Sequence, residues 1–419
     1  MMRGVGIANP IAYARLPPQS TRGGSNETMN RRHTRPLTAV AVGFALALTA
    51  VPGSADETTP AGATPKITIS GFLDWYYQYS FSHPASGTNL PGRAFDIRND
   101  SFTLNQLEVS IARPTTDQSP VGFTATLTAG KTADLVHLYE PGGAVTHAFY
   151  NDTPTRFLQQ LYGTYLIRGK SPVTIDFGKF VTHMGYEVIE SWANDNFSRS
   201  LLFTYAIPLY HTGLRFTVPM SKELTAQLLL VNGWNSVEDD NSSKSIGMQL
   251  NYKPNDRLNV ILNYMGGNEG GKALGNGVFS GIGFPDDHVR NVQVVDLVAV
   301  ANPTPKLKVG LNVDYGGAFA AGDSGTWSGQ AYYARYQITP STALALRYDR
   351  LQDTGLRLGA DTQISALTAT LEYTVKGSLV NRLEFRHDQS GNAGAFGFPG
   401  GGGVGRRQDT VTFAQVYKF

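Results

Sequence analysis

The 419-residue sequence contains no cysteine. This absence excludes a disulfide framework, a thiolate metal site and a cysteine nucleophile. The chain after residue 55 also lacks an apolar run long enough for a transmembrane helix, and no segment shows a sustained helical period. Mean hydropathy is slightly negative, at −0.20. Helical membrane proteins and disulfide-rich secreted domains are therefore excluded, whereas a β-barrel stays possible because every second residue of its strands faces water.

The chain has little excess charge of either sign. Its 35 basic and 33 acidic residues give a net charge of +2. Residues 1–55 hold six of the arginines and one glutamate, so the rest of the chain has a net charge of −3. The basic character belongs to the first segment, and no nucleic-acid partner is expected.

The first segment has the order of an export signal. From Met29, a basic stretch (30–35) precedes an apolar run (37–51) and the small residues of 52–55. This order predicts a secretory signal peptide over 29–55, with general secretory export and cleavage after Ala55. Residues 1–28 resemble neither targeting signal nor fold, and we interpret them as an upstream mis-start. Residues 56–66 are then a short periplasmic linker.

The final residues alternate between a bulky and a small or polar face. Val411, Phe413, Tyr417 and Phe419 share one parity. A period of two predicts a β-strand between unlike media. An aromatic residue in this position resembles the assembly signal of bacterial outer-membrane barrels, which makes Tyr417 and Phe419 its candidates here. The alternative is an edge strand of a soluble sandwich.

The same alternation recurs along the chain in sixteen segments, an even number. Short turns separate them on one side and long loops on the other. This pattern predicts an all-β fold, a transmembrane antiparallel up-and-down β-barrel of about 16 strands (range 14–18) covering residues 67–419 in the bacterial outer membrane. The predicted strands are 67–80, 99–112, 120–131, 156–168, 172–181, 209–218, 223–232, 244–253, 257–266, 290–301, 306–316, 328–338, 342–352, 364–375, 379–389 and 410–419.

The two faces of the strands differ in polarity. The apolar parity must face lipid, since a mid-bilayer Lys or Arg on that face costs about 2–4 kcal/mol. The charged parity then lines the lumen, although a solvated face of a soluble sheet would give the same pattern. Segment 290–301 is apolar on both parities, which suggests a bulge or a register error. The lumen-lining candidates are Asp314, Arg347, Asp349, Glu372, Arg382, Glu384 and Arg386.

The longest predicted outside loop, 182–208, combines charges with many apolar residues. Its constriction candidates are Glu187, Glu190, Asp195 and Arg199. An apolar loop of this length is unfavourable in solvent, so we expect it to fold into the lumen. Packing over the rim or against a neighbouring subunit are the alternatives. The small excess of acids on the loop predicts a weak preference for cations.

Several short motifs resemble the OmpL-like β-barrel porin family. They are Ile69–Tyr77, Phe177–Phe180, Asn196–Phe203, Pro208–Gly213 and Leu229–Trp234. The resemblance covers most of the chain after the signal and implies an outer-membrane channel for small solutes. It carries no ligand signature, so no substrate, cofactor, metal or catalytic residue is expected from it.

Sixteen strands leave an aqueous channel, which favours passive diffusion of small hydrophilic solutes and ions. A surface-exposed adhesin or structural barrel is the main alternative. An outer-membrane barrel enzyme is a weaker one, because it needs a catalytic constellation at the rim. Expected partners are outer-membrane lipid, the barrel assembly machinery and periplasmic chaperones. A homotrimer follows only from resemblance to general porins.

Overall fold

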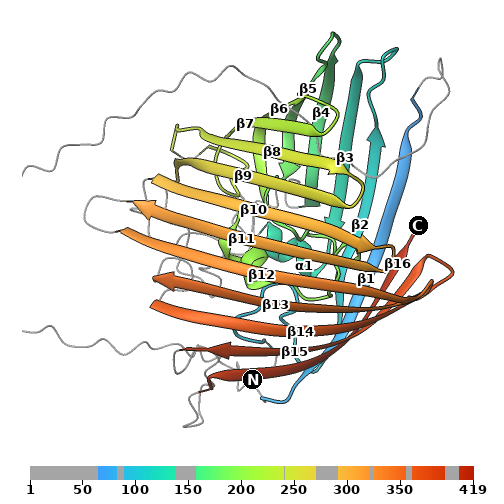
Figure 1. Cartoon of the computed structure of the whole chain (residues 1–419), viewed down its shortest axis with the longest axis vertical. Helices are drawn as coiled ribbons and strands as arrows, with labels where there is room; N and C mark the ends of the chain where they lie inside the picture. The colour runs from blue at the N-terminus through green and yellow to red at the C-terminus, as the bar shows by residue number, and fades with distance from the viewer. Residues whose placement is uncertain are drawn as a thin grey trace, which may run out of the picture. The chain divides into compact units, whose positions relative to one another are not determined.

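The computed structural model describes residues 65–82, 89–137, 157–239, 241–269, 291–319, 324–354, 361–391 and 405–419. Within them, sixteen antiparallel strands form one closed barrel (Figure 1). Every strand pairs with its neighbours in chain order, and β1 pairs with β16 to close the ring. The predicted fold is confirmed. None of the described helices is long and apolar enough to cross a membrane.

All sixteen predicted segments are strands, and most of their ends differ from the prediction by no more than three residues. The strands are β1 Thr68–Ser80, β2 Ser101–Arg113, β3 Val121–Ala129, β4 Leu158–Ile167, β5 Val173–Val181, β6 Tyr210–Pro219, β7 Leu224–Val231, β8 Ser245–Asn255, β9 Leu258–Asn268, β10 Asn291–Thr304, β11 Leu307–Phe319, β12 Ser324–Thr339, β13 Thr342–Thr354, β14 Asp361–Val375, β15 Leu379–Ser390 and β16 Arg407–Lys418. A short helix, α1 (Lys131–Val136), follows β3.

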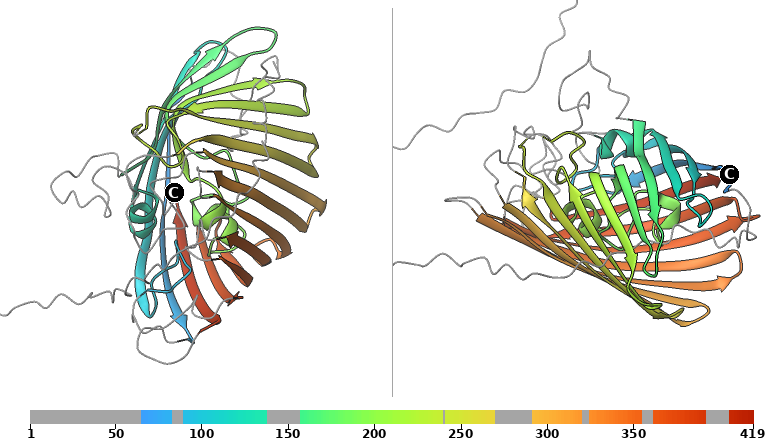
Figure 2. Two further views of the ribbon diagram at one scale, coloured as in Figure 1. Left: turned by 90° about the vertical axis from the view of Figure 1, so that its left-hand side faces the viewer. Right: turned by 90° about the horizontal axis from the view of Figure 1, so that it is seen from above.

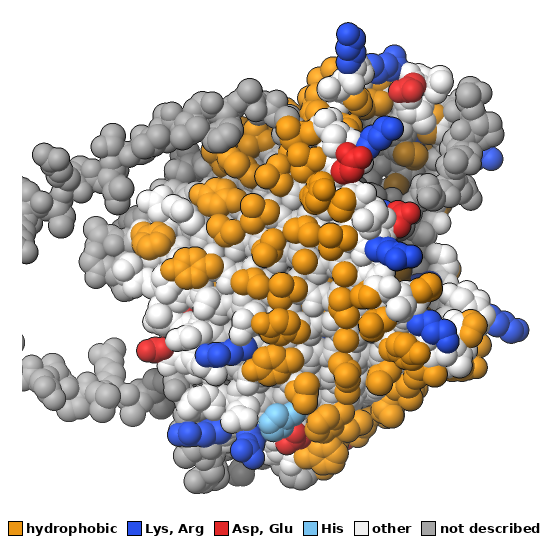
Figure 3. Space-filling model, viewed as in Figure 1, with side chains coloured by type: hydrophobic (Ala, Val, Ile, Leu, Met, Phe, Trp, Pro, Cys, Tyr) orange, Lys and Arg blue, Asp and Glu red, His pale blue; other side chains and the backbone are white. Residues whose placement is uncertain are grey.

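Alternation along each strand separates the two faces of the wall. In β13, Leu346 is 45% exposed, whereas the adjacent Arg347 is 1% exposed. Figure 3 shows the outcome on one side of the barrel, where apolar side chains gather over the middle of β8–β13. The exposed apolar parity is the surface that lipid requires, and the buried parity points inward.

Two of the connections predicted to be long are short. Only residues 320–323 separate β11 from β12, and 355–360 separate β13 from β14, where the sequence suggested 317–327 and 353–363. The strands continue as a paired ribbon past the alternating segment, because cross-strand hydrogen bonds do not depend on which residue type faces outward. The strict alternation of short and long connections therefore fails on this side.

The segment between β5 and β6, residues 182–209, is the longest connection that is described throughout. We call it the inner loop. It contains a 3-10 turn, η2 (Ser191–Ala193), and a π-helical turn, η3 (Leu202–Ala206). In Figure 2 these green turns lie between opposite walls of the barrel.

Candidate luminal constriction

The inner loop has little regular structure, so its backbone N–H groups must find other acceptors. Carboxylates on the inner wall provide them. Glu384 of β15 accepts from the backbone N–H groups of Phe197 and Ser198, at 2.6 and 3.0 Å. Further along, Asp349 of β13 accepts from Leu201 at 2.9 Å. The wall thus positions the loop backbone directly.

Arginines on the same wall donate to carbonyl groups of the loop. Arg347 Nη1 donates to Ser198 O at 2.5 Å, and Arg386 Nη1 donates to Arg199 O at 2.7 Å. Arg382 donates to Ser191 O at 2.6 Å and to Asn194 O at 2.7 Å. A guanidinium carries five donors in a fixed plane, which allows one side chain to satisfy several carbonyls.

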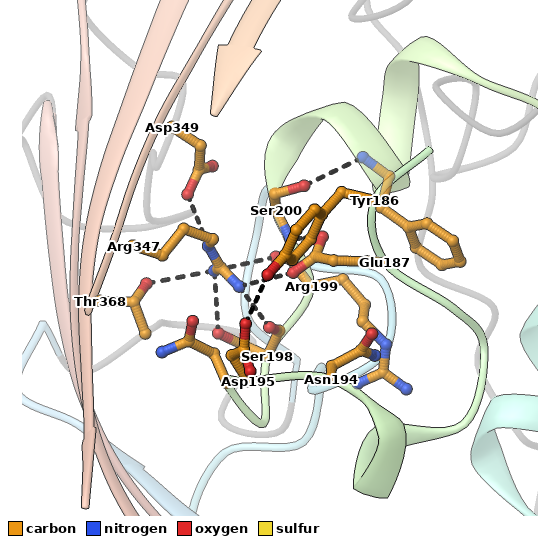
Figure 4. A network of polar contacts seen from close by, with 12 residues as sticks. Tyr186, Glu187, Asn194, Asp195, Ser198, Arg199, Ser200, Arg347, Asp349 and Thr368 are labelled. Atoms are coloured by element: carbon orange, nitrogen blue, oxygen red, sulfur yellow. Dashed lines mark hydrogen bonds and ion pairs between the residues drawn. The ribbon is translucent and has the colours of Figure 1, made fainter. Parts of the chain in front are cut away.

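Ion pairs join the loop acids to the wall cations. Arg347 lies 3.0 Å from Glu187 of the loop and 2.7 Å from Asp349 of its own strand, and all three side chains are buried (Figure 4). At another point, Lys308 Nζ lies 2.6 Å from Asp195 Oδ1. Two of the predicted constriction acids are therefore paired with wall cations rather than free to face a passing solute.

Arg199, another predicted constriction residue, is directed into the loop itself. Its guanidinium donates to Phe197 O at 2.5 Å, to Val188 O at 3.1 Å and, at a shorter distance, to Ile189 O. The group also lies 4.9 Å from the centre of the Phe95 ring. Burial lowers the pKa of Arg199 from its ordinary value. This arginine orders the loop and is not presented to an open pore.

An apolar core fills the space between the inner loop and the wall. Ile189, Leu201, Leu202 and Phe203 of the loop are buried in one cluster with inward-facing wall residues. The wall members include Val292, Val294, Trp327, Ala331, Leu351, Ile364 and Ala366. Trp327 Nε1 donates to Ala206 O at 3.0 Å. These contacts remove the apolar residues of the loop from water, which is favourable.

The other predicted lumen residues also lie on the buried face. Glu372 pairs with Arg382 and Arg335, each at 2.7 Å. Asp314 is buried opposite Asp296 on the neighbouring strand. The remaining constriction candidate, Glu190, accepts from Gln159 Nε2 of β4 at 2.5 Å, and burial raises its pKa. The structure brings these residues inward, and their roles in permeation remain predictions.

Residues proposed for assembly lie at the seam of the barrel. Phe419 exchanges backbone hydrogen bonds with Gly71, each at 3.0 Å, and Tyr417 faces outward. The proposed cleavage site at Ala55 lies outside the described residues.

Sequence reasoning missed two parts of the interior. Segment 89–98, predicted as part of an outside loop, contributes buried Arg93, which lies 2.7 Å from Asp388 of β15. The apolar inner wall was also missed. Its signal was the segment 290–301, where both parities are apolar because Val292 and Val294 face the inner loop while Val295 faces outward. The register of β10 is regular there and shifts only between Ala301 and Thr304.

A closed sixteen-stranded barrel with an apolar exterior and a charged interior crossed by a loop defines a porin-like barrel. The model of a family described as "Putative beta-barrel porin-2, OmpL-like" matches residues 66–419. The chain belongs to this family of outer-membrane β-barrel proteins, as its motifs suggested.

Solved structures show the same fold at low identity. OmpT of Vibrio cholerae, folded in vitro, has a TM-score of 0.55 at 8% identity, over 87% of this chain and 100% of that one. The outer-membrane channel DcaP of Acinetobacter baumannii has a TM-score of 0.56 at 11% identity, over 86% of this chain and 99% of that one. An anion-selective porin from Comamonas acidovorans has a TM-score of 0.53 at 11% identity, over 84% of this chain and 99% of that one. No curated protein matches the sequence.

Proposed function

We propose that this protein is an outer-membrane channel through which small hydrophilic solutes and ions diffuse passively, with the inner loop narrowing its lumen. The observation that carries the proposal is a closed sixteen-stranded wall with charged inward-facing side chains. A barrel of this size leaves an aqueous lumen when its side chains alone occupy it. The family and the porin folds it resembles support the same function.

The position of the inner loop supports the narrowing. Its contacts to Arg347, Arg382 and Arg386 hold it against β13 and β15, and its apolar core packs on β10–β14. Permeating solutes would pass beside this loop rather than through an open cylinder.

The paired charges change the expected origin of selectivity. Glu187 and Asp195 have cationic partners, so they contribute little net field. Glu190 forms no ion pair with any described cation, and it faces Glu108 of the wall across Gln159. Any cation preference would therefore depend on how far Glu190 and Glu108 are ionised, rather than on the whole set of loop acids.

Single-channel recording in a planar bilayer tests the proposal. The purified barrel should give stepwise conductance in potassium chloride, and Glu190→Gln should shift the reversal potential further than Glu187→Gln. A barrel that inserts without conductance would instead favour the adhesin or structural alternative. The enzyme alternative gains no support from the family, and we propose no catalytic residues.

Export and assembly are further parts of the proposal. Cleavage after Ala55 by the secretory route would give a mature chain beginning at Asp56, which an intact mass measurement of the membrane-inserted protein tests. Tyr417 and Phe419 would engage the assembly machinery, so deleting Phe419 should lower the amount of heat-modifiable barrel in outer membranes. A homotrimer is supported by the trimer form of Vibrio cholerae OmpT, and native mass spectrometry would test it.

A further inference from the structure

One arc of the barrel rim is basic. Between β4 and β11, four short connections join consecutive strands, at 168–172, 220–223, 256–257 and 305–306. They carry five exposed basic residues, which are Arg168, Lys170, Lys222, Arg257 and Lys306. The acidic residues in these connections are Glu223 and Asp256, so the arc has a net charge of +3. We call it the basic rim.

The excess of basic residues is confined to this arc. The other three short connections, 114–120, 340–341 and 376–378, hold Asp117 and Lys376 and are neutral together. At the opposite ends of β7–β10, the described connecting residues have a net charge of −2. They are Glu238, Asp239, Lys244 and Glu269.

The basic rim is not neutralised by the chain itself. Among the ion pairs formed by described residues, none includes any of its five basic residues. One of its two acids, Asp256, is instead paired with Lys253 of β8, at 3.5 Å. All five cations are therefore available to an anionic partner outside the chain.

An apolar band lies beside the basic rim on the outer face of the barrel. Its members are 37% to 51% exposed, and they are Tyr165, Ile167, Met220, Tyr252 and Leu258. Figure 3 shows basic side chains along the edge of the short turns, next to apolar side chains of the wall. Aromatic and aliphatic side chains followed by cations are typical of the boundary between hydrocarbon and headgroups.

We propose that the basic rim binds the phosphate groups of anionic phospholipids of the phosphatidylglycerol type. Ammonium and guanidinium groups bind phosphate through charge-assisted hydrogen bonds, and each cation near an anionic lipid surface adds to the attraction. A lipid contacts both parts of the arc, because its headgroup meets the cations while its acyl chains meet the apolar band. Short turns face the periplasm in barrels of this class, so the lipids belong to the periplasmic leaflet.

This preference goes beyond the contact with lipid that every membrane barrel makes, since it selects one headgroup at one arc of the ring. It does not rest on the proposed transport function, because lipid binding can be measured without a current. A barrel that binds phosphatidylglycerol without conducting would leave this inference intact.

Native mass spectrometry of the full barrel in neutral detergent tests the proposal. The barrel is titrated with phosphatidylglycerol or with phosphatidylcholine of the same acyl chains, and we expect phosphatidylglycerol to bind about fivefold more tightly or better. Higher ionic strength should reduce this preference, because exposed charges are screened. Combining Lys170→Gln, Lys222→Gln and Arg257→Gln should largely abolish it.

The matched control removes three exposed basic residues from the opposite rim, by combining Lys244→Gln, Arg406→Gln and Arg407→Gln. It should keep the wild-type preference, although its net charge changes by the same amount. Heat-modifiability on gels first establishes that each variant is folded. If the basic-rim variant fails this check, Glu223→Lys decides, because an added cation should tighten phosphatidylglycerol binding.

Equal binding of the two lipids by the wild type overturns the proposal. An unchanged preference in the folded basic-rim variant or in Glu223→Lys does so as well, and so does an equal loss in the control. Sedimentation with purified peptidoglycan separates the other anionic partner on this side of the membrane. If the basic-rim variant loses sedimentation but keeps its lipid preference, the arc binds the cell-wall polymer and the lipid assignment is wrong.

Discussion

Leu346 and Arg347 are neighbours in β13, yet they meet different surroundings. Leu346 lies on the outer face between strands that present apolar residues, whereas Arg347 bonds to Glu187, Asp349 and the loop backbone. Opposite substitutions at these two positions therefore probe the two faces separately.

Leu346→Arg should impair insertion. Hydrocarbon cannot solvate a guanidinium, and the cost on the lipid face is about 2–4 kcal/mol near the midplane. We expect less folded barrel in urea titrations in lipid vesicles, with unchanged conductance in the molecules that do insert. Leu346→Ile, which keeps the face apolar, is the control. Full tolerance of the arginine would contradict the outward assignment.

Arg347→Leu should release the inner loop. The change leaves Glu187 and Asp349 buried without their cation, and breaking a buried pair in this way costs about 3–5 kcal/mol. Larger and noisier single-channel conductance is expected, while insertion stays near normal because β13 keeps its hydrogen bonds. Arg350→Leu, on the outward parity of the same strand, removes an equal charge as the control. Wild-type conductance in Arg347→Leu would show that this pair does not hold the loop.

The sequence could predict which face these residues occupy, but not which partners they have. Lipid and water impose the alternation on every strand, so Arg347 had to face inward. Its partner Glu187 is 160 residues away in the chain. That contact depends on the path of the inner loop, and no local pattern specifies such a path.

Among the elements, strands were predictable and connections were less so. A strand in a bilayer has its period set by its surroundings, and all sixteen segments appear in the structure. The ends of β11 and β12 were misjudged because pairing continues where the alternation stops. Inward folding of the inner loop followed from its apolar content, and the structure places it in the lumen. The apolar inner wall that this loop packs on was not predicted, although apolar residues on both parities of β10 were its signal.

The inner loop should loosen in acid through His183, near its first residue. Burial lowers the pKa of His183 to about 4 from an ordinary value of 6.5. The His183 ring packs tightly against Gly247: a Cβ atom added to this glycine would lie 2.9 Å from Cε1 of the histidine. Arg215 disfavours the protonation of His183 and Asp296 favours it, and Nε2 contacts Tyr264 O at 3.2 Å.

Acid weakens the packing of the inner loop because the pKa of His183 is lower in the packed state than in the released state. As the pH falls below 6.5, the released histidine takes up a proton more readily than the packed one, so packing loses stability until about pH 4. The total loss in the free energy of packing between pH 6.5 and pH 4 is about 3 kcal/mol. Conductance should therefore rise between pH 6.5 and 4 in the wild type and stay flatter in His183→Asn. An identical pH profile in both proteins would assign the response to another group.

At the scale of the whole molecule, the wall and the inner loop contribute differently to stability. The wall satisfies its backbone groups between strands around a closed ring, which is the condition for crossing a membrane. The inner loop adds an apolar core and buried ion pairs inside that ring. The wall should accordingly fold without the loop, and the loop should set what passes through.

Replacing residues 186–205 by a short Gly/Ser linker tests this division. We expect a heat-modifiable barrel with a lower melting temperature, because Trp327, Leu351 and Ile364 lose their apolar partners while Arg347 and Asp349 become hydrated. Conductance should increase severalfold as the lumen widens. Trp327 should become accessible to an aqueous quencher, which reports on the lumen even in barrels that do not conduct. Replacing the exposed turn 220–223 by the same kind of linker is the control. If the deletion abolishes folding while this control folds, the inner loop is part of the folding core, and the stability of the barrel depends on its interior as much as on its wall.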